Sequence, residues 1–443
     1  MKTILKLTII FVLTLIFTSC SSKTYTIEIH EKDHNSKERK KVALFLDGTA
    51  NDRNSRTNIS KVFEIVANQN KDNMYLFYNE GVGTSGRFLG AMTGWGTDKD
   101  VKEAYSFLSD YYKSGDKLYI FGFSRGAYTA RILAGMLYTV GIYDLSNFND
   151  KDKEEIISEL YHDAYKGNSV KVQKSKEKIL SDKDKIINKW NKKREIKTII
   201  APFSENIIDI LGIWDTVEAL GIIPTKEALN DKLSIKKDNQ EFTTPNKKYV
   251  DQICNIKKTF HAISLDDNRA YVFTPIIMTN KEKIDYCPYK SIENTVEEVW
   301  FSGAHADVGG GYDKNNTLSG VSLNWMLNKI NKFEENDKLL PSEYKVFENI
   351  YGTIHNAEEG ISAAYKEGIR INILKKYLEK SQYEKIKIHK SVKNRLENQP
   401  IPNGFDSKWY EDNFFKNCVD VQKNDKGTKI TFNDCKNITI IGD

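Results

Sequence analysis

The chain lacks a strong excess of charge of either sign. Its 443 residues include 66 Lys and Arg against 61 Asp and Glu, which leaves a formal net charge of only +5. This balance indicates a heavily charged, solvated surface rather than a surface that binds nucleic acid. The sequence also lacks the interleaved aromatic and basic residues that bind single strands. We therefore expect no nucleic-acid partner.

The N-terminus lacks an apolar run long enough to span a bilayer comfortably. The run Leu7–Phe17 follows the basic start Met1–Lys6 and precedes Thr18-Ser19-Cys20-Ser21-Ser22. This pattern predicts a lipoprotein-type signal peptide over residues 1–20, with Cys20 lipidated as the mature N-terminus. Phe17 stands where such sites usually have leucine, so an ordinary signal peptide or a retained anchor is the alternative. We expect a protein of the bacterial cell envelope, lipid-anchored to a membrane and facing the periplasm.

Cysteine is scarce, with five in total, and no spacing among them resembles a zinc site. We expect no metal and no other cofactor. In an oxidising compartment the four cysteines after Cys20 can form disulfides, and three pairings are possible. Proximity across an apparent hairpin favours Cys418 with Cys435, which leaves Cys254 with Cys287. Free thiols are the alternative.

The length and the hydrophobic content of 40% favour one large catalytic domain with an insertion and an extension. Residues 21–40 are polar and are predicted to be a linker, and the catalytic domain is predicted over residues 41–330. The lysine- and glutamate-rich residues 147–197 have helical spacing and predict either a cap over the site or a plain solvated hairpin. Residues 331–443 are predicted to form a C-terminal extension, helical at first, with a small β-hairpin over residues 420–441.

Several apolar runs alternate with helix-like segments. The first is residues 41–49, a run typical of a strand buried on both faces of a parallel sheet. The others are residues 74–78, 118–121, 207–214, 259–265 and 296–302. This alternation predicts an α/β fold of the α/β-hydrolase kind, with a mostly parallel sheet and helices on both faces. Right-handed crossovers would bring Asp47, Ser124, Asp215 and His305 to one edge of that sheet.

The most specific pattern is Gly122-Phe123-Ser124-Arg125-Gly126, in which an apolar strand leads into a serine flanked by glycines. It is typical of a nucleophile elbow, a strained strand-to-helix turn where side chains at both glycine positions would collide with neighbouring backbone. A glycine-rich turn of a nucleotide-binding fold is the alternative. It is weaker, because no Gly-x-Gly-x-x-Gly or Walker lysine pattern surrounds the turn. Ser124 is therefore the predicted nucleophile.

A serine hydroxyl becomes a nucleophile when a nearby base accepts its proton. His305 is the best placed of seven histidines, because it stands in a glycine-rich loop after an apolar strand. His389 and His261 are the rivals, although the position of His261 inside an apolar strand is more typical of a core residue. We predict that His305 is the general base.

The base needs a carboxylate to orient it, and Asp215 stands where the apolar run 207–214 ends. Asp266 and Asp267 end the following strand and are the alternative acids, because this architecture places the acid after more than one strand. Asp307 is too close to His305 along the chain to be preferred.

The negative oxygen of a tetrahedral intermediate needs preorganised N–H donors. The amide of Arg125, directly after the nucleophile, is the first predicted donor. Gly48 or Thr49, where the first strand ends, is predicted to supply the second. Asp47 is the alternative organiser of that turn, holding it by hydrogen bonds alone.

Several spaced motifs in order resemble the catalytic domain of type VI secretion lipase effectors of the first phospholipase class. They lie between about Lys41 and Met326, with a fainter echo at residues 388–392. The motifs are residues 46–49, Asn51, Asp52, residues 57–59, 81–84, 122–131, 214–217, 266–269 and 300–312. The resemblance implies an α/β-hydrolase fold, hydrolysis of glycerophospholipid acyl esters, and a triad of Ser124, Asp215 and His305. It also implies an immunity or secretion-apparatus partner.

The leading hypothesis is a membrane-tethered serine phospholipase or lipase whose substrate is membrane phospholipid. Effectors of this class usually lack an export signal. A resident envelope esterase or a lipid-remodelling enzyme is therefore equally compatible with the sequence. The alternatives are an envelope carboxylesterase or thioesterase acting on soluble esters, and a non-catalytic lipoprotein scaffold.

Overall fold

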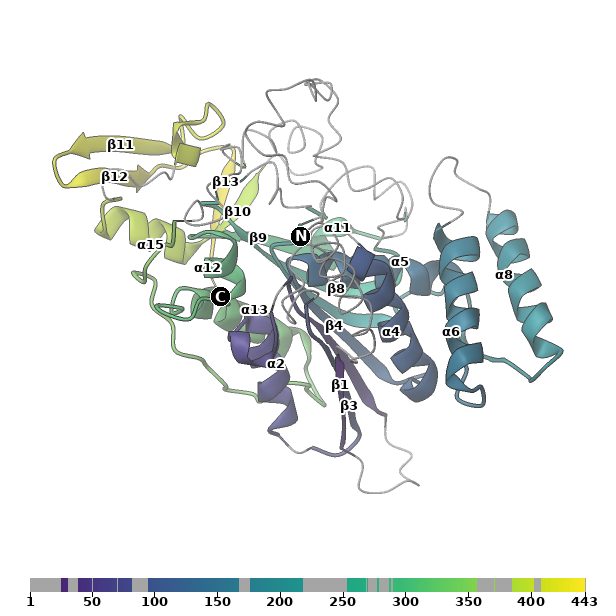
Figure 1. Cartoon of the computed structure of the whole chain (residues 1–443). Coiled ribbons are helices and arrows are strands. Elements are labelled where there is room, and N and C mark those ends of the chain that lie inside the picture. Colours follow the sequence, from purple (N-terminus) through teal and green to yellow (C-terminus); the bar gives the residue numbers. More distant parts are fainter. Residues whose placement is uncertain are drawn as a thin grey trace, which may run out of the picture.

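The structure is a computed structural model of the whole chain (Figure 1). The described residues are 25–30, 39–49, 51–69, 71–81, 95–166, 176–217, 253–267, 269, 277–278, 287, 290–356, 370, 385–401 and 408–442. The predicted signal peptide and Cys20 lie outside these ranges.

A nine-stranded sheet forms the centre of the described part of the chain (Figure 1). Its strands, in spatial order, are β1 (Tyr25–His30), β3 (Met74–Asn79), β2 (Lys41–Leu46), β4 (Lys117–Phe123), β7 (Ile208–Trp214), β8 (Ile256–Ser264), β9 (Val296–Phe301), β10 (Ile386–His389) and β13 (Ile438–Ile441). All neighbouring pairs are parallel except β1 with β3. The predicted mostly parallel α/β fold is confirmed.

Helices cover both faces of the sheet or pack beside it. They are α2 (Asn58–Ala67), α4 (Trp95–Tyr111), α5 (Arg125–Val140), α6 (Asp150–Glu159), α8 (Lys176–Asn191), α11 (Ile292–Thr295), α12 (His305–Gly309), α13 (Ser319–Phe333) and α15 (Lys390–Asn398). Along β2, Val42 and Leu44 pack with α4 and α5, whereas Ala43 and Phe45 pack with α2 and α13. This alternation of side chains across the strand is what gives the sheet two apolar faces. No helix in the described ranges is long and apolar enough to cross a membrane.

The predicted polar linker contains the edge strand β1. This strand runs antiparallel to β3, with Tyr25 opposite Asn79 and His30 opposite Met74. The Tyr25 ring also packs on Phe77, with 5.2 Å between ring centroids. The prediction was wrong here because no residue of this edge strand is fully buried, so the strand can form without a continuous apolar run.

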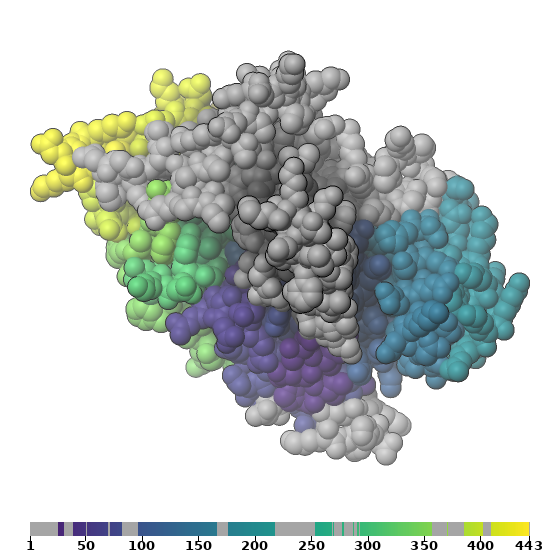
Figure 2. Space-filling model, viewed as in Figure 1, coloured from purple at the N-terminus to yellow at the C-terminus, as the bar shows by residue number. Residues whose placement is uncertain are grey.

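The predicted helical insertion forms a hairpin that packs on the side of the molecule rather than over the strand ends (Figures 1 and 2). It consists of α6, the π-helical turn η2 (Leu160–Lys166) and α8. Its apolar residues join the core of α4 and α5, among them Ile156, Tyr161 and Trp190. These buried side chains decide against the solvated-hairpin alternative. The predicted cap is also wrong for the described residues, because these residues pack beside α4 and α5 rather than over the strand ends. A two-stranded sheet joins the segments before α6 and after α8. Its strands are β5 (Ile142–Asp144) and β6 (Lys197–Ile200).

The C-terminal extension is continuous with the main sheet, because β10 pairs with β9 and β13 pairs with β10. Of the hairpin predicted over residues 420–441, β11 (Val419–Asn424) and β12 (Gly427–Phe432) are present next to the short helix η4 (Lys408–Glu411), whereas residues 438–441 belong to β13 of the main sheet. It projects from one end of the molecule (Figure 2). The favoured disulfides are confirmed, Cys418 with Cys435 and Cys254 with Cys287.

Candidate active site

Ser124 occupies a strained turn between β4 and α5. Its backbone has φ 58° and ψ −122°, a combination that L-residues seldom adopt. A Cβ at Gly126 would lie 2.0 Å from the carbonyl oxygen of Leu46, and a Cβ at Gly122 would lie 2.6 Å from Cα of Ala127. Both glycines are therefore required by close backbone contact, as the elbow pattern predicts.

His305 begins α12 directly beside this turn. Its ring packs on the Phe123 ring, with 4.7 Å between centroids, and its side chain is buried. Nδ1 forms a hydrogen bond with Oδ2 of Asp215. Because Asp215 engages Nδ1, Nε2 is the ring nitrogen that can take the proton of a serine hydroxyl. The structure thus brings together His305 and Asp215, which are remote in sequence, beside the turn that holds Ser124.

Asp215 follows β7 and is completely buried. Its backbone has φ 40°, and its amide donates to the carbonyl of Ala262 at 2.7 Å. The amide of Ser264 donates to Oδ1 at 3.0 Å. A carboxylate held in this way by two neighbouring strand ends can orient the imidazole of His305.

The alternative acids have other partners. Asp266 accepts from the Gly303 amide at 2.6 Å and from the Trp409 indole at 3.0 Å, so it links two loops. Asp267 accepts from the backbone amide of His305 at 3.1 Å and from the Arg269 guanidinium at 2.6 Å. Asp267 therefore supports the position of His305 without contacting its ring.

The rival histidines are held in structural contacts. In β8, His261 lies 2.8 Å from Glu298 through Nδ1 and accepts from the Thr216 amide at 3.3 Å through Nε2. His389 caps α15, and its Nδ1 lies 2.8 Å from the Ser391 hydroxyl. His261 is thus the satisfied core histidine that its apolar strand predicts.

Another histidine, His355, is held in a structural contact next to α12. Nδ1 of His355 lies 2.6 Å from Asp307, and the His355 ring stacks on Tyr312 with 3.7 Å between centroids. Asp307 also accepts from the Ala304 amide at 3.0 Å. Asp307 therefore caps the helix that begins with His305, and its carboxylate is engaged by His355.

The turn after β2 lies against Ser124. A Cβ at Gly48 would be 3.2 Å from Cβ of Ser124. The Gly48 amide donates to Oδ1 of Asp47 at 2.7 Å, so of the two predicted donors Thr49 is the one favoured for an oxyanion. The amide of Arg125 is the first of α5, and an α-helix does not use its first amides internally.

Asp47 organises this turn. Besides the Gly48 amide, it accepts from the hydroxyls of Thr57 and Tyr78, each at 2.7 Å. Burial outweighs these hydrogen bonds and raises the pKa of Asp47 to about 6.

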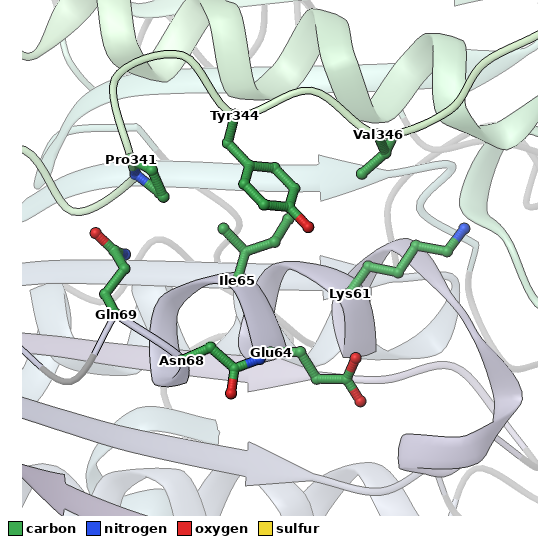
Figure 3. A pocket seen from close by; sticks show the side chains of 8 residues that line it. All are labelled: Lys61, Glu64, Ile65, Asn68, Gln69, Pro341, Tyr344 and Val346. Carbon is green, nitrogen blue, oxygen red and sulfur yellow. The ribbon is translucent and has the colours of Figure 1, made fainter.

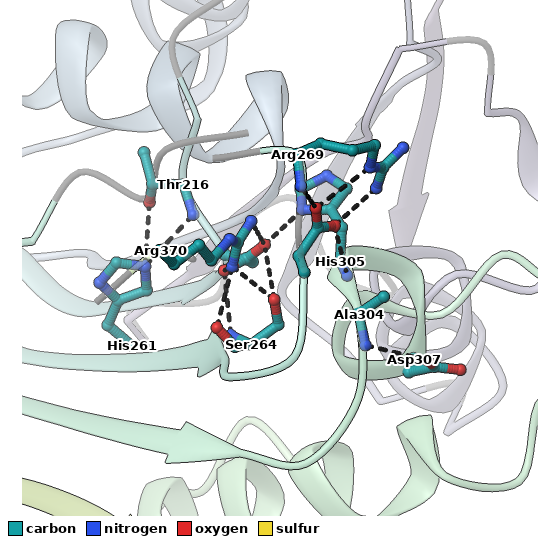
Figure 4. Close-up of polar contacts among 10 residues, drawn as sticks. Thr216, His261, Ser264, Arg269, Ala304, His305, Asp307 and Arg370 are labelled. Atoms are coloured by element: carbon teal, nitrogen blue, oxygen red, sulfur yellow. Dashed lines mark hydrogen bonds and ion pairs between the residues drawn. The ribbon is translucent and has the colours of Figure 1, made fainter. Parts of the chain in front are cut away.

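Sequence reasoning missed Arg370, which is completely buried and bonded to Asp215. Figure 4 shows Arg370 beside Ser264. Its two terminal nitrogens donate to Oδ1 and Oδ2 of Asp215 at 2.8 and 2.9 Å, and one of them also donates to the carbonyl of Ser264 at 2.9 Å. No motif surrounds Arg370, so only the long-range contact reveals it.

Charge and burial oppose each other at this site. Burial favours the neutral form of Asp215, but the Arg370 charge and the His305 hydrogen bond together hold its pKa well below the usual range. Burial also lowers the pKa of His305, against the opposing effect of Asp215. The arrangement keeps an ionised acid beside a neutral base, the state from which a serine can be deprotonated.

A groove of about 290 Å³ lies elsewhere, between α2 and residues 341–346 (Figure 3). Tyr344 points from the loop towards Ile65 of the helix, and Lys61 extends beside them (Figure 3). The groove is lined by Lys61, Glu64, Ile65, Asn68, Gln69, Pro341, Tyr344 and Val346. It contains none of the predicted catalytic residues.

Comparisons with known proteins place most of the chain in one family. The family model described as T6SS, Phospholipase effector Tle1-like, catalytic domain, matches residues 40–329. The uncharacterized protein YEL023C of Saccharomyces cerevisiae is 32% identical over 133 residues, which are 26% of this chain and 19% of the yeast protein. The chain thus spans about a fifth of the length of that relative.

Solved structures with low similarity were also found. An uncharacterized protein from Pseudomonas aeruginosa is 15% identical, with a TM-score of 0.32, over 65% of this chain and 45% of that one. The Tle1 effector bound to the VgrG spike of the type 6 secretion system is 16% identical, with a TM-score of 0.28, over 66% and 58% of the two chains. Esterase 2 of Thermogutta terrifontis is 14% identical, with a TM-score of 0.34, over 71% and 89%.

Proposed function

The chain belongs to the Tle1-like family of type VI secretion phospholipase effectors through its catalytic domain, and from this premise we propose that it is a serine-dependent lipid ester hydrolase. More specifically, it would act as a phospholipase A on membrane glycerophospholipids through an acyl-enzyme. The observation that carries the proposal is the pairing of His305 with Asp215 beside the strained turn of Ser124.

The proposed reaction begins when Oγ of Ser124 attacks the ester carbonyl carbon while Nε2 of His305 takes the hydroxyl proton. The carbonyl oxygen becomes negative and accepts hydrogen bonds from the amides of Arg125 and Thr49. Collapse breaks the bond to the leaving alcohol, which receives the proton from His305. A water then repeats these steps on the acyl-enzyme and releases the fatty acid.

Replacing Ser124 with alanine tests this proposal. We expect S124A to release no fatty acid from phospholipid vesicles above the uncatalysed rate, because the acyl-enzyme cannot form. A fluorophosphonate probe should label the wild type and not S124A. Undiminished release by S124A would rule Ser124 out as the nucleophile.

We also propose that Cys20 is lipidated and that the anchor holds the catalytic edge of the sheet close to a membrane. Tyr25 lies five positions after Cys20, a reach of at most about 18 Å. Tyr25 lies opposite Asn79, the last residue of β3, at the edge where Ser124 follows β4. Three strand spacings between β1 and β4 add only about 14 Å. The tether is therefore short enough to keep the site near its bilayer substrate.

A comparison of two substrates tests the tether. We expect C20S to lose most of its activity on phospholipid vesicles while it hydrolyses a dispersed short-chain ester at the wild-type rate. A flexible insertion of about 20 residues after Ser22 should give an intermediate loss, because a longer linker lowers the effective concentration. Equal vesicle activity of C20S and the wild type would contradict the proposed anchor.

The same assays distinguish two alternative functions. A soluble-ester carboxylesterase or thioesterase would prefer dispersed esters to vesicles even with the anchor intact. A non-catalytic scaffold would fail to react with fluorophosphonate. A secretion-apparatus or immunity partner is proposed from the family alone.

A further inference from the structure

Arg370 lies far beyond residue 329, where the family match ends, yet it reaches the centre of the candidate site. Its side chain and that of Asp215 are both completely inaccessible to solvent. A buried cation of this kind must be paired, and Arg370 is paired with the acid predicted to orient His305.

We propose that Arg370 is a positioning residue for the triad, whose guanidinium clamps the Asp215 carboxylate in the plane that presents Oδ2 to Nδ1 of His305. The C-terminal part of the chain would then complete a site whose other members come from the catalytic domain. This inference rests on the proposed hydrolase function.

The geometry of the contact supports a clamp. The two terminal nitrogens of Arg370 meet the two carboxylate oxygens separately, at 2.8 and 2.9 Å. Two parallel N–H···O bonds fix the plane of the carboxylate, which a single bond does not. Because Oδ2 also bonds His305, fixing this plane fixes the direction from which the imidazole is held.

Ser264 closes the arrangement (Figure 4). Its amide donates to Oδ1 of Asp215 at 3.0 Å, and its carbonyl accepts from Arg370 at 2.9 Å. Arg370, Asp215 and the end of β8 therefore form a ring of hydrogen bonds. Rotation of the carboxylate would break at least two of these bonds at once.

The guanidinium also acts on the base by its charge. The charged groups that influence His305 are Asp215, Asp267 and Arg370, and Arg370 opposes the effect of the two carboxylates. Without Arg370, the imidazolium form would be more stable, and the pKa of His305 would rise.

The test compares R370K and R370M with the wild type, using fluorophosphonate labelling and the kcat and KM of a dispersed ester. We expect R370M to lower kcat about 10- to 100-fold with little change in KM, less than the ~10⁴-fold loss that can follow removal of the orienting acid. R370K should recover part of this loss. The acid limb of the pH profile of kcat/KM should move to higher pH in R370M.

Two controls separate positioning from folding. R395M removes another buried arginine of the C-terminal part, whose guanidinium donates to the carbonyls of Ile350 and Gly352 at 2.7 Å and is not bonded to Asp215. R395M should keep the wild-type pH profile. In a D215N background, R370M should lower kcat by a further factor of less than about three. The reason is that the effects of residues that act through one another are not additive.

The proposal is overturned if R370M keeps the wild-type kcat and acid limb, or if its loss is fully additive with D215N. A wild type that fluorophosphonate does not label would instead refute the proposed function. An NMR titration of His305 tests the effect of the Arg370 charge even then, because it needs no turnover. An unchanged His305 pKa in R370M would overturn the electrostatic part of the proposal.

Discussion

At the residue scale, the strained turn at Ser124 depends on neighbours that have no side chain. Ser124 holds a positive φ between two glycines that touch backbone atoms of β2 and α5. The strain is maintained because the parallel sheet and the helix leave the turn no other conformation. The conformation of Ser124 therefore depends on steric exclusion at the two glycine positions.

Gly126→Ala tests this dependence. The new Cβ would lie 2.0 Å from the Leu46 carbonyl, so β2 and α5 must separate or the elbow must distort. We expect a loss of several kcal/mol in the free energy of unfolding, or no folded protein, because core overpacking by backbone contact is costly. Gly442→Ala is the matched control, since its nearest neighbour would be 3.8 Å away. Similar thermal unfolding of both variants would contradict the steric argument.

The buried Asp47 predicts a pH dependence of stability. Its folded-state pKa is raised to about 6, mainly by burial, from an ordinary value of 3.8. An acid with a raised pKa stabilises the fold fully below the unfolded value, and this contribution is lost as the pH rises through about 6. Two pKa units correspond to roughly 3 kcal/mol. Between pH 4 and 8, D47N should therefore lose less stability than the wild type in denaturant titrations. Parallel pH curves for the two proteins would refute this assignment.

At the element scale, the central parallel strands are extended on both sides of the sheet, by β1 on one side and by β10 and β13 on the other. β1 brings the N-terminal end of the described chain to the catalytic edge, and β10 brings His389 beside Phe301, with 4.9 Å between ring centroids. The disulfides join segments next to other strands. Cys254 precedes β8, and Cys418 precedes β11.

Removing the Cys254–Cys287 disulfide by double substitution with serine should lower the free energy of unfolding by about 3 to 4 kcal/mol. The two cysteines are 33 residues apart, and the stabilisation arises mainly because the cross-link restricts the unfolded chain. The shorter separation of 17 residues between Cys418 and Cys435 should give a slightly smaller loss, about 3 kcal/mol. Equal stability of the reduced and oxidised wild type would contradict both expectations.

At the scale of the whole molecule, the catalytic domain and the C-terminal part share one sheet. A chain that ends after Phe333 would lack β10, β13 and Arg370, and it would expose the apolar side chains of Ile263 and Trp300. We expect this truncation to be insoluble or inactive, because an uncovered sheet edge favours aggregation and Asp215 would keep a buried, uncompensated charge. Solubility and fluorophosphonate labelling of the truncated chain measure this. Full labelling of the truncated chain would show that the C-terminal part is dispensable.

The sequence by itself determined the features that depend on local sterics and on burial periodicity. The elbow around Ser124, the continuous apolar strands and the position of His305 after one of them all follow from residues close together in the chain. The favoured disulfides were also predictable, because short separation along the chain brings Cys418 near Cys435.

Only the tertiary structure decided the features that depend on pairing between distant segments. β1 is an edge strand without a fully buried residue, and polar residues alternate with its two isoleucines, so its composition resembled a linker. The hairpin of α6 and α8 lies beside α4 and α5 because Trp190 and Tyr161 bury there, a destination that helical spacing does not encode. Arg370 meets Asp215 across 155 residues, and no local pattern marks a charge whose partner is so remote.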